Sequence, residues 1–240
     1  MVVAYFDCYS GVAGDMILGA LIDLGVDENY LKKELEKLDL SGYIFDVKKI
    51  KKGSINASDV YITVNIKEQH RRSFKDIKKI INNSSLDDDV KKTSIEIFQR
   101  LAEAESKVHN TSVEDVHFHE VGAIDSIVDI VGSVIGLKKL GVDQIYCSSL
   151  PLGSGTVKCA HGIIPIPAPA TKELVQNIPT YKSKANHEMV TPTGAAIVTT
   201  LSSSFGKMPP LKILKTGYGA GKIKSNMPGL LRIYIGKLEK

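Results

Sequence analysis

The chain has few cysteines and no long hydrophobic run. Cys8, Cys147 and Cys159 are the three cysteines among 240 residues, and no two of them form a CxxC pair. We therefore expect neither a disulfide framework nor a thiolate zinc knuckle, and a reducing, cytoplasmic compartment fits best. No window approaches the roughly 18 apolar residues of a membrane span, and no basic segment precedes an apolar stretch at the amino terminus. The sequence thus predicts a soluble protein that is not exported and has no membrane partner.

A strong excess of one charge sign is also missing. Lysine and arginine number 31 against 27 aspartates and glutamates, a net charge of +4, and the basic pairs are scattered among acids. Nucleic-acid binding usually needs a concentrated basic face, so we expect no nucleic-acid partner. The composition, 43% hydrophobic and 24% charged, is that of a globular protein. Its length allows one large domain or two small subdomains.

Several common catalytic motifs are absent. The sequence contains no GxxxxGKS or GxxxxGKT, no GxGxxG and no GxSxG. A P-loop, a dinucleotide-binding turn and a nucleophile elbow are therefore excluded. Cys8 stands before an expected helix start, which can lower a thiol pKa, but it has no histidine beside it in sequence. We therefore expect no covalent nucleophile.

The apolar periodicity predicts strands that alternate with helices. The expected strands cover 1–7, 43–52, 55–67, 144–149 and 230–235, with a shorter one within 113–122. The expected helices cover 16–24, 27–38, 73–81, 86–108 and 124–140, and two more end near 176 and start at 191. This alternation predicts an α/β fold, with α+β as the alternative, in which helices pack on a mixed sheet. A subdomain boundary is expected near 67–86.

Local signals refine this assignment. Ser73 and Asp87 are expected to cap the helices that follow them. The helix over 124–140 is apolar nearly all round, so it should be buried. The glycine-rich stretch 217–221 is expected to be a loop that turns the chain, with close contact to a ligand as the alternative.

The sharpest cluster of chemistry-bearing residues is His117, His119 and Glu120, followed by Asp125 and Asp129. On a strand the two histidines point to one face, and on the next helix the two aspartates, four residues apart, share a face. Imidazole and carboxylate ligands suit nickel, zinc, iron or manganese. Both aspartates lie in an apolar helix, where a buried carboxylate costs several kcal/mol unless it is paired or binds a cation. The pattern predicts a metal site.

A structural interpretation of the same residues stays open. The aspartates could cap neighbouring loops or pair with lysine or arginine, and the histidines could lie on a solvent face. His161 and His187 could add ligands from elsewhere in the fold, although each alone is a weak signal.

Two glycine-rich helix starts could bind anions, because free backbone N–H groups and the helix dipole favour negative charge there. A tight turn or a plain N-cap explains each of them equally well. Asp15 would repel a bare phosphate, so we expect a cation to bridge the two. The candidate anion-binding residues are Ser10, Gly11, Gly14, Asp15, Thr191, Thr193 and Gly194.

Four motifs, in order, resemble the LarC family of nickel insertion proteins. They stand at 5–16, 116–130, 151–155 and 191–195, and the resemblance runs from residue 3 to about 235. It implies a CTP-dependent nickel insertase, a chelatase of the lyase class. Such an enzyme places Ni²⁺ into pyridinium-3,5-bisthiocarboxylic acid mononucleotide through one carbon–metal and two sulfur–metal bonds, completing the nickel-pincer cofactor of lactate racemase.

Members of this family usually continue into a carboxy-terminal domain, where the nucleotide and metal sites are best established. This chain ends at Lys240 and so looks like the amino-terminal portion. The resemblance implies CTP with Mg²⁺ or Mn²⁺, at a site expected in the carboxy-terminal part. It further implies a nucleotide-like cofactor precursor as ligand, and either a homo-oligomer or a partner that carries the carboxy-terminal domain.

The resulting hypothesis is a protein that holds a divalent metal, Ni²⁺, and delivers it to an anionic nucleotide-like precursor. His117 and His119 would be ligands, and Glu120, Asp125 or Asp129 would be a third ligand or would orient an imidazole. One alternative is a metal-dependent phosphohydrolase, in which the same cluster activates water. The other is a non-catalytic scaffold or metal-delivery subunit.

Overall fold

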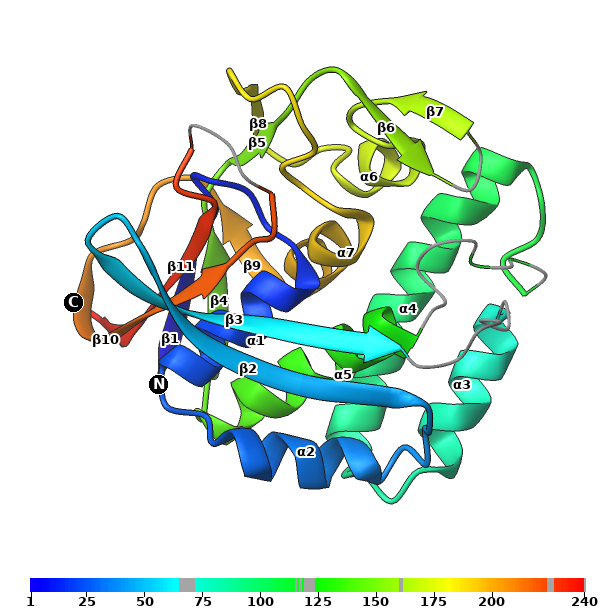
Figure 1. Cartoon of the computed structure of the whole chain (residues 1–240), viewed down its shortest axis with the longest axis horizontal. Coiled ribbons are helices and arrows are strands. Elements are labelled where there is room, and N and C mark those ends of the chain that lie inside the picture. Colours follow the sequence, from blue (N-terminus) through cyan, green and yellow to red (C-terminus); the bar gives the residue numbers. More distant parts are fainter. Residues whose placement is uncertain are drawn as a thin grey trace.

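The computed structural model describes residues 1–64, 72–114, 116, 118, 124–159, 162–223 and 227–239, except the side chain of Cys159. Within these residues, seven strands form one mixed sheet in the order β2-β3-β10-β11-β1-β4-β9 (Figure 1). The pairs β1–β4, β4–β9 and β3–β10 are parallel, and the other three are antiparallel. The strands are β1 (Val3–Asp7), β2 (Tyr43–Lys52), β3 (Ile55–Val64), β4 (Gln144–Cys147), β9 (Ser202–Phe205), β10 (Leu211–Ala220) and β11 (Leu230–Leu238).

Seven described helices accompany the sheet, which confirms the α/β prediction. The β2–β3 hairpin crosses in front of α1 and α5 in Figure 1, and both helices contact β3. The helices are α1 (Gly14–Asp23), α2 (Glu28–Glu36), α3 (Phe74–Asn83), α4 (Asp88–His109), α5 (Ile124–Lys139), α6 (Pro169–Leu174) and α7 (Pro192–Leu201). Two small strand pairs form sheets of their own: β5 (Leu150–Leu152) with β8 (Thr180–Lys182), and β6 (Thr156–Cys159) with β7 (Gly162–Pro165).

Helix α5 occupies the centre of the main hydrophobic core. It contacts α1, α2, α4 and α7 as well as β3, and most of its side chains are buried. The same core takes in residues from β1 to β11. The predicted burial of this helix is therefore confirmed. A charged group on the side of α5 that faces the core is surrounded by apolar side chains. A subdomain boundary near 67–86 stays a prediction.

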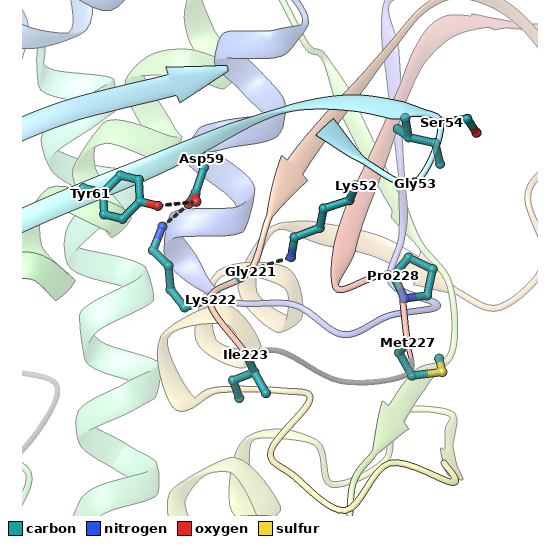
Figure 2. A pocket seen from close by; sticks show the side chains of 11 residues that line it. Lys52, Gly53, Ser54, Asp59, Tyr61, Gly221, Lys222, Ile223, Met227 and Pro228 are labelled. Carbon is teal, nitrogen blue, oxygen red and sulfur yellow. Dashed lines mark hydrogen bonds and ion pairs between the residues drawn. The ribbon is translucent and has the colours of Figure 1, made fainter. Parts of the chain in front are cut away.

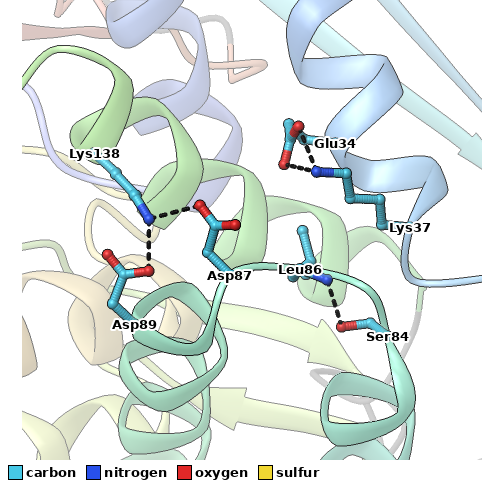
Figure 3. Close-up of polar contacts among 7 residues, drawn as sticks. All are labelled: Glu34, Lys37, Ser84, Leu86, Asp87, Asp89 and Lys138. Carbon is cyan, nitrogen blue, oxygen red and sulfur yellow. Dashed lines mark hydrogen bonds and ion pairs between the residues drawn. The ribbon is translucent and has the colours of Figure 1, made fainter.

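The two expected caps behave differently. Ser73 begins α3 with a reciprocal capping box, in which its hydroxyl accepts from the backbone N–H of Asp76. Asp87 stands at the N-cap of α4, but its side chain caps no backbone group. Figure 3 shows that Lys138 of α5 binds the carboxylates of Asp87 and Asp89 instead, at 2.7 and 2.6 Å. The Asp87 carboxylate therefore binds the Lys138 ammonium instead of the backbone N–H groups of α4, and this contact joins α5 to the start of α4.

One local assignment was wrong, and another falls mostly outside the described residues. The stretch 217–221 is not a turning loop, because its first four residues are the end of strand β10. A Cβ atom at Gly217 would lie 2.5 Å from the carbonyl oxygen of Ala20, and one at Gly219 would clash with that of Met16. The glycines are there because the backbone of α1 lies directly on the strand. Within 113–122, the described residues 113, 114, 116 and 118 form no strand.

We expect Gly219→Ala to lower the free energy of unfolding by about 1–3 kcal/mol or more, because the added methyl group meets helix backbone that cannot move aside. In a domain of this size, that is a loss of several degrees in melting temperature. Gly221→Ala is the matched control, since its nearest contact is the flexible side chain of Met16 at 3.1 Å. Equal melting temperatures for the two variants would contradict this packing.

In the described part of the chain, no helix has both the length and the apolar composition that a membrane crossing requires.

Candidate functional site

The two glycine-rich helix starts lie side by side. The backbone N–H of Val12, before α1, donates to the carbonyl of Met189 at 2.8 Å, and the N–H of Thr191 donates to the carbonyl of Val12 at 3.1 Å. Gly11 has a φ of 99°, and a side chain on it or on Gly194 would clash with the facing backbone. Close backbone packing therefore explains these two glycines. The two motifs lie far apart in the sequence, and the fold brings them into direct backbone contact.

A small cavity of about 170 Å³ opens where these helix starts meet. Ser10, Asp15, His187 and Thr191 line it together with Lys222. The Thr191 hydroxyl accepts from the N–H of Gly194 at 3.1 Å and so caps α7. The remaining candidate, Thr193, is buried within α7. Anion binding by this set of residues stays a prediction.

The side chain of Asp129 packs against the start of α1. Gly14, the first residue of α1, packs on Asp129 of α5 so closely that a Cβ atom would clash with its carboxylate. Asp129 Oδ1 is buried and, among the described residues, has no hydrogen-bond partner. Burial, together with the nearby charges of Asp15 and Asp125, raises the pKa of Asp129 well above its ordinary value. Asp129 thus occupies the space that a side chain at position 14 would need.

The negative charges of the neighbouring carboxylates, Asp15 and Asp125, are better compensated by nearby groups or solvent than that of Asp129. Burial raises the pKa of Asp15, but the Lys222 ammonium, 3.5 Å from Asp15 Oδ2, and the Met16 N–H act against it. Asp125, one turn before Asp129, accepts the N–H of Ser126 at 2.9 Å. Partial desolvation raises its pKa too, although its side chain retains contact with solvent. Asp129 is therefore the carboxylate with the least local compensation.

Lys222 ties this carboxylate group to the β2–β3 hairpin. Its ammonium pairs with the buried Asp59, donates to the carbonyl of Val60, and lies 4.0 Å from the centre of the Tyr61 ring. The Tyr61 hydroxyl donates to Asp59 Oδ2 at 2.7 Å. A single lysine thus neutralises carboxylates from α1 and β3 at once.

On the hairpin side of Lys222 lies a larger cavity, of about 700 Å³ (Figure 2). Lys52, at the end of β2, reaches into it and donates to the carbonyls of Gly221 and Gly229 at 2.7 and 3.1 Å. Sequence analysis missed Lys52, Asp59, Tyr61 and Lys222. One signal was available, since Asp59 is an acid within the otherwise small and apolar run 57–60.

The histidine part of the predicted cluster lies outside the described residues. This part consists of His117, His119, Glu120 and His161. The described neighbours Val116 and Phe118 are buried, and their backbones bond to Phe74 and Arg72 at the start of α3. Among the described residues, no three histidine, cysteine, aspartate or glutamate side chains are placed to hold a metal together.

The cysteines provide no exposed nucleophile in the described structure. Cys8 and Cys147 are fully buried free thiols, and their sulfur atoms lie 3.6 Å apart. The contact with Cys8 and burial raise the pKa of the Cys147 thiol well above its ordinary value. Their proximity arises because β1 and β4 are parallel neighbours, with Phe6 opposite Cys147. Sequence spacing could not indicate it.

Known proteins match the chain closely in sequence. A pyridinium-3,5-bisthiocarboxylic acid mononucleotide nickel insertion protein of Desulfitobacterium hafniense is 46% identical over 99% of this chain and 59% of its own length. A protein of the same name from Acetivibrio thermocellus is 48% identical over 100% of this chain and 61% of its own. The chain thus spans about three fifths of the length of these relatives. No solved structure matches it. The family model for nickel insertion proteins matches residues 4–240, and the chain belongs to that family.

Proposed function

We propose that this chain takes part in inserting Ni²⁺ into a pyridinium-type mononucleotide and that the acidic start of α5 helps to hold the metal. The observation that carries the proposal is the Oδ1 atom of Asp129, which is buried, has no hydrogen-bond partner among the described residues, and feels the charge of Asp15. Both carboxyl groups are held near each other by the close packing of α1 on α5 at Gly14.

A cation would resolve this electrostatic conflict. Two acidic groups in a poorly solvated place repel each other, and one of them must either take up a proton or find a positive partner. Lys222 forms an ion pair with Asp15, but no described lysine, arginine or histidine forms an ion pair with Asp129. A divalent ion between the start of α5 and the residues just before it would supply that charge.

The proposed ligands are His117 and His119, with Asp129 and either Glu120 or Asp125 as carboxylate partners. His161 is a further proposed ligand. The histidines immediately precede α5 in sequence, and Val116 and Phe118 anchor that segment in the core. Imidazole with carboxylate is a ligand set that nickel accepts, and the imidazoles must be neutral to bind it. The nickel is cargo, so the site must hold it and also release it.

The names of the relatives indicate which molecule receives the nickel, here called the acceptor. Both relatives described above are named for nickel insertion into pyridinium-3,5-bisthiocarboxylic acid mononucleotide. We propose the same acceptor here, with CTP and Mg²⁺ or Mn²⁺ as further requirements. We also propose that the active species is a homo-oligomer or a complex with a partner that carries the carboxy-terminal family domain. Ser10 and the other residues at the two helix starts are proposed contacts of the acceptor.

Mass spectrometry tests this function directly. The nickel-loaded chain would be mixed with the precursor mononucleotide, with and without CTP and Mg²⁺, and with and without a relative's carboxy-terminal domain. The expected product is the precursor with nickel added. Loss of the phosphate group instead would identify the phosphohydrolase. Nickel that stays on the chain in every mixture would contradict insertion.

A further inference from the structure

The cavity between the β2–β3 turn and the end of β10 has the chemistry of an anion site. Figure 2 shows Lys52 projecting into it between the Asp59, Tyr61 and Lys222 group and the wall at Pro228. The Lys52 ammonium is held by two backbone carbonyls, those of Gly221 and Gly229. These contacts fix its position and leave one of its three N–H donors for another partner.

The charges of the lining favour a negative ligand. Among the described residues, no carboxylate lies within ion-pair distance of Lys52, whereas Lys222 is already paired with Asp15 and Asp59. The cavity is therefore lined by two ammonium groups and one carboxylate, that of Asp59. A lysine without a carboxylate partner, held in place inside a cavity, is a ready contact for a phosphate oxygen.

The size and the remaining walls favour a ligand larger than a free ion. A volume of about 700 Å³ falls in the range of small-molecule sites. Ile55, Ile223 and Pro228 supply apolar surface to the same cavity. A ligand with an anionic group and a flat ring would use both parts of this lining.

We propose that this cavity binds the phosphate of a pyridinium mononucleotide, with Lys52 as the direct contact of the phosphate. The identity of the nucleotide rests on the proposed function, whereas the anion contact rests on the lining alone. The position also suits that function, because Lys222 borders both this cavity and the carboxylates beside α5. Lys52 would thus hold the acceptor within reach of the proposed metal site.

Titration calorimetry with nicotinate mononucleotide tests the proposal. This probe carries a pyridinium ring, a carboxylate and a phosphate. Lys52→Met, which keeps an unbranched apolar side chain, should weaken its binding by about tenfold or more. Lys52→Arg should restore a large part of the affinity. Lys51→Met is the matched control, because Lys51 is exposed and neighbouring residues of a strand point to opposite faces.

Two further ligands separate the sources of binding. Nicotinate riboside lacks the phosphate and should bind the wild-type chain and Lys52→Met equally weakly, while inorganic phosphate should bind weakly and depend on Lys52. Equal mononucleotide binding by wild type and Lys52→Met would overturn the proposal. Riboside binding as tight as mononucleotide binding, or no mononucleotide binding at millimolar concentration, would do so as well. Nickel binding, measured on the same variants, should be unchanged, so a failure here is distinct from a failure of the metal site.

Discussion

Replacing both His117 and His119 by alanine should lower the nickel affinity of the chain by at least about a hundredfold. Loss of a group that merely orients a ligand already costs about 10–100-fold in metal affinity, and this change removes two proposed ligands. Because a protonated imidazole cannot bind metal, wild-type affinity should also fall as the pH drops below about 6.5. Calorimetric titration with Ni²⁺ measures both effects.

The control for this experiment is His109→Ala. His109 is the last residue of α4, and its Nε2 atom lies 3.3 Å from Oε2 of Glu105, so it has a structural contact of its own. Its removal should leave nickel affinity within about twofold of wild type, in line with the small effects of changes outside a site. Undiminished nickel binding by the double variant would show that the histidine pair is not the site.

Asp129→Asn should stabilise the metal-free chain, and the gain should grow with pH. The pKa of Asp129 is raised in the folded chain, so between its unfolded value, about 3.9, and its folded value the folded state holds more protons than the unfolded state. The stability of the wild type therefore decreases as the pH rises through this window. Asparagine does not titrate, so the variant escapes that loss. At pH 7.5 we expect a melting temperature at least about 2–4 °C higher than that of wild type, which corresponds to about 1 kcal/mol.

Thermal melts in EDTA from pH 4 to pH 8 measure this difference, which should vanish near pH 4. Asp125→Asn is the matched control on the same helix, and because Asp125 retains solvent contact its effect should be smaller. With saturating Ni²⁺, wild type should gain more melting temperature than Asp129→Asn does. A large loss of stability in Asp129→Asn without metal would instead indicate that this carboxylate makes a structural ion pair.

The frame of the fold was predictable because burial imposes periodicity on the sequence. The apolar surface of α5 follows directly from the side chains that face the core, and the strands expected at 43–52 and 55–67 are present as β2 and β3. The same method failed at Gly217 and Gly219. Glycine in a loop and glycine under a crossing helix look alike in sequence, and the difference lies in the approach of α1 from far away in the chain.

The candidate site was predictable only where its residues are neighbours in sequence. Asp125 and Asp129 stand out because acids are costly in an apolar helix. The approach of Asp15 to Asp129 depends on how α1 packs on α5, and that of Lys222 depends on the parallel pairing of β10 with β3. Lys52 is one of many scattered lysines, and its two carbonyl partners come from residues about 170 positions away. No local pattern could select it.

The central claim is that nickel binds at the start of α5. Anomalous scattering at the nickel edge, from a crystal soaked in Ni²⁺, tests it most directly. We predict one strong peak within coordination distance of Asp129, on the side of the segment that contains His117 and His119. A peak only at exposed residues such as His109, or at the buried thiols of Cys8 and Cys147, with none beside Asp129, would contradict the account.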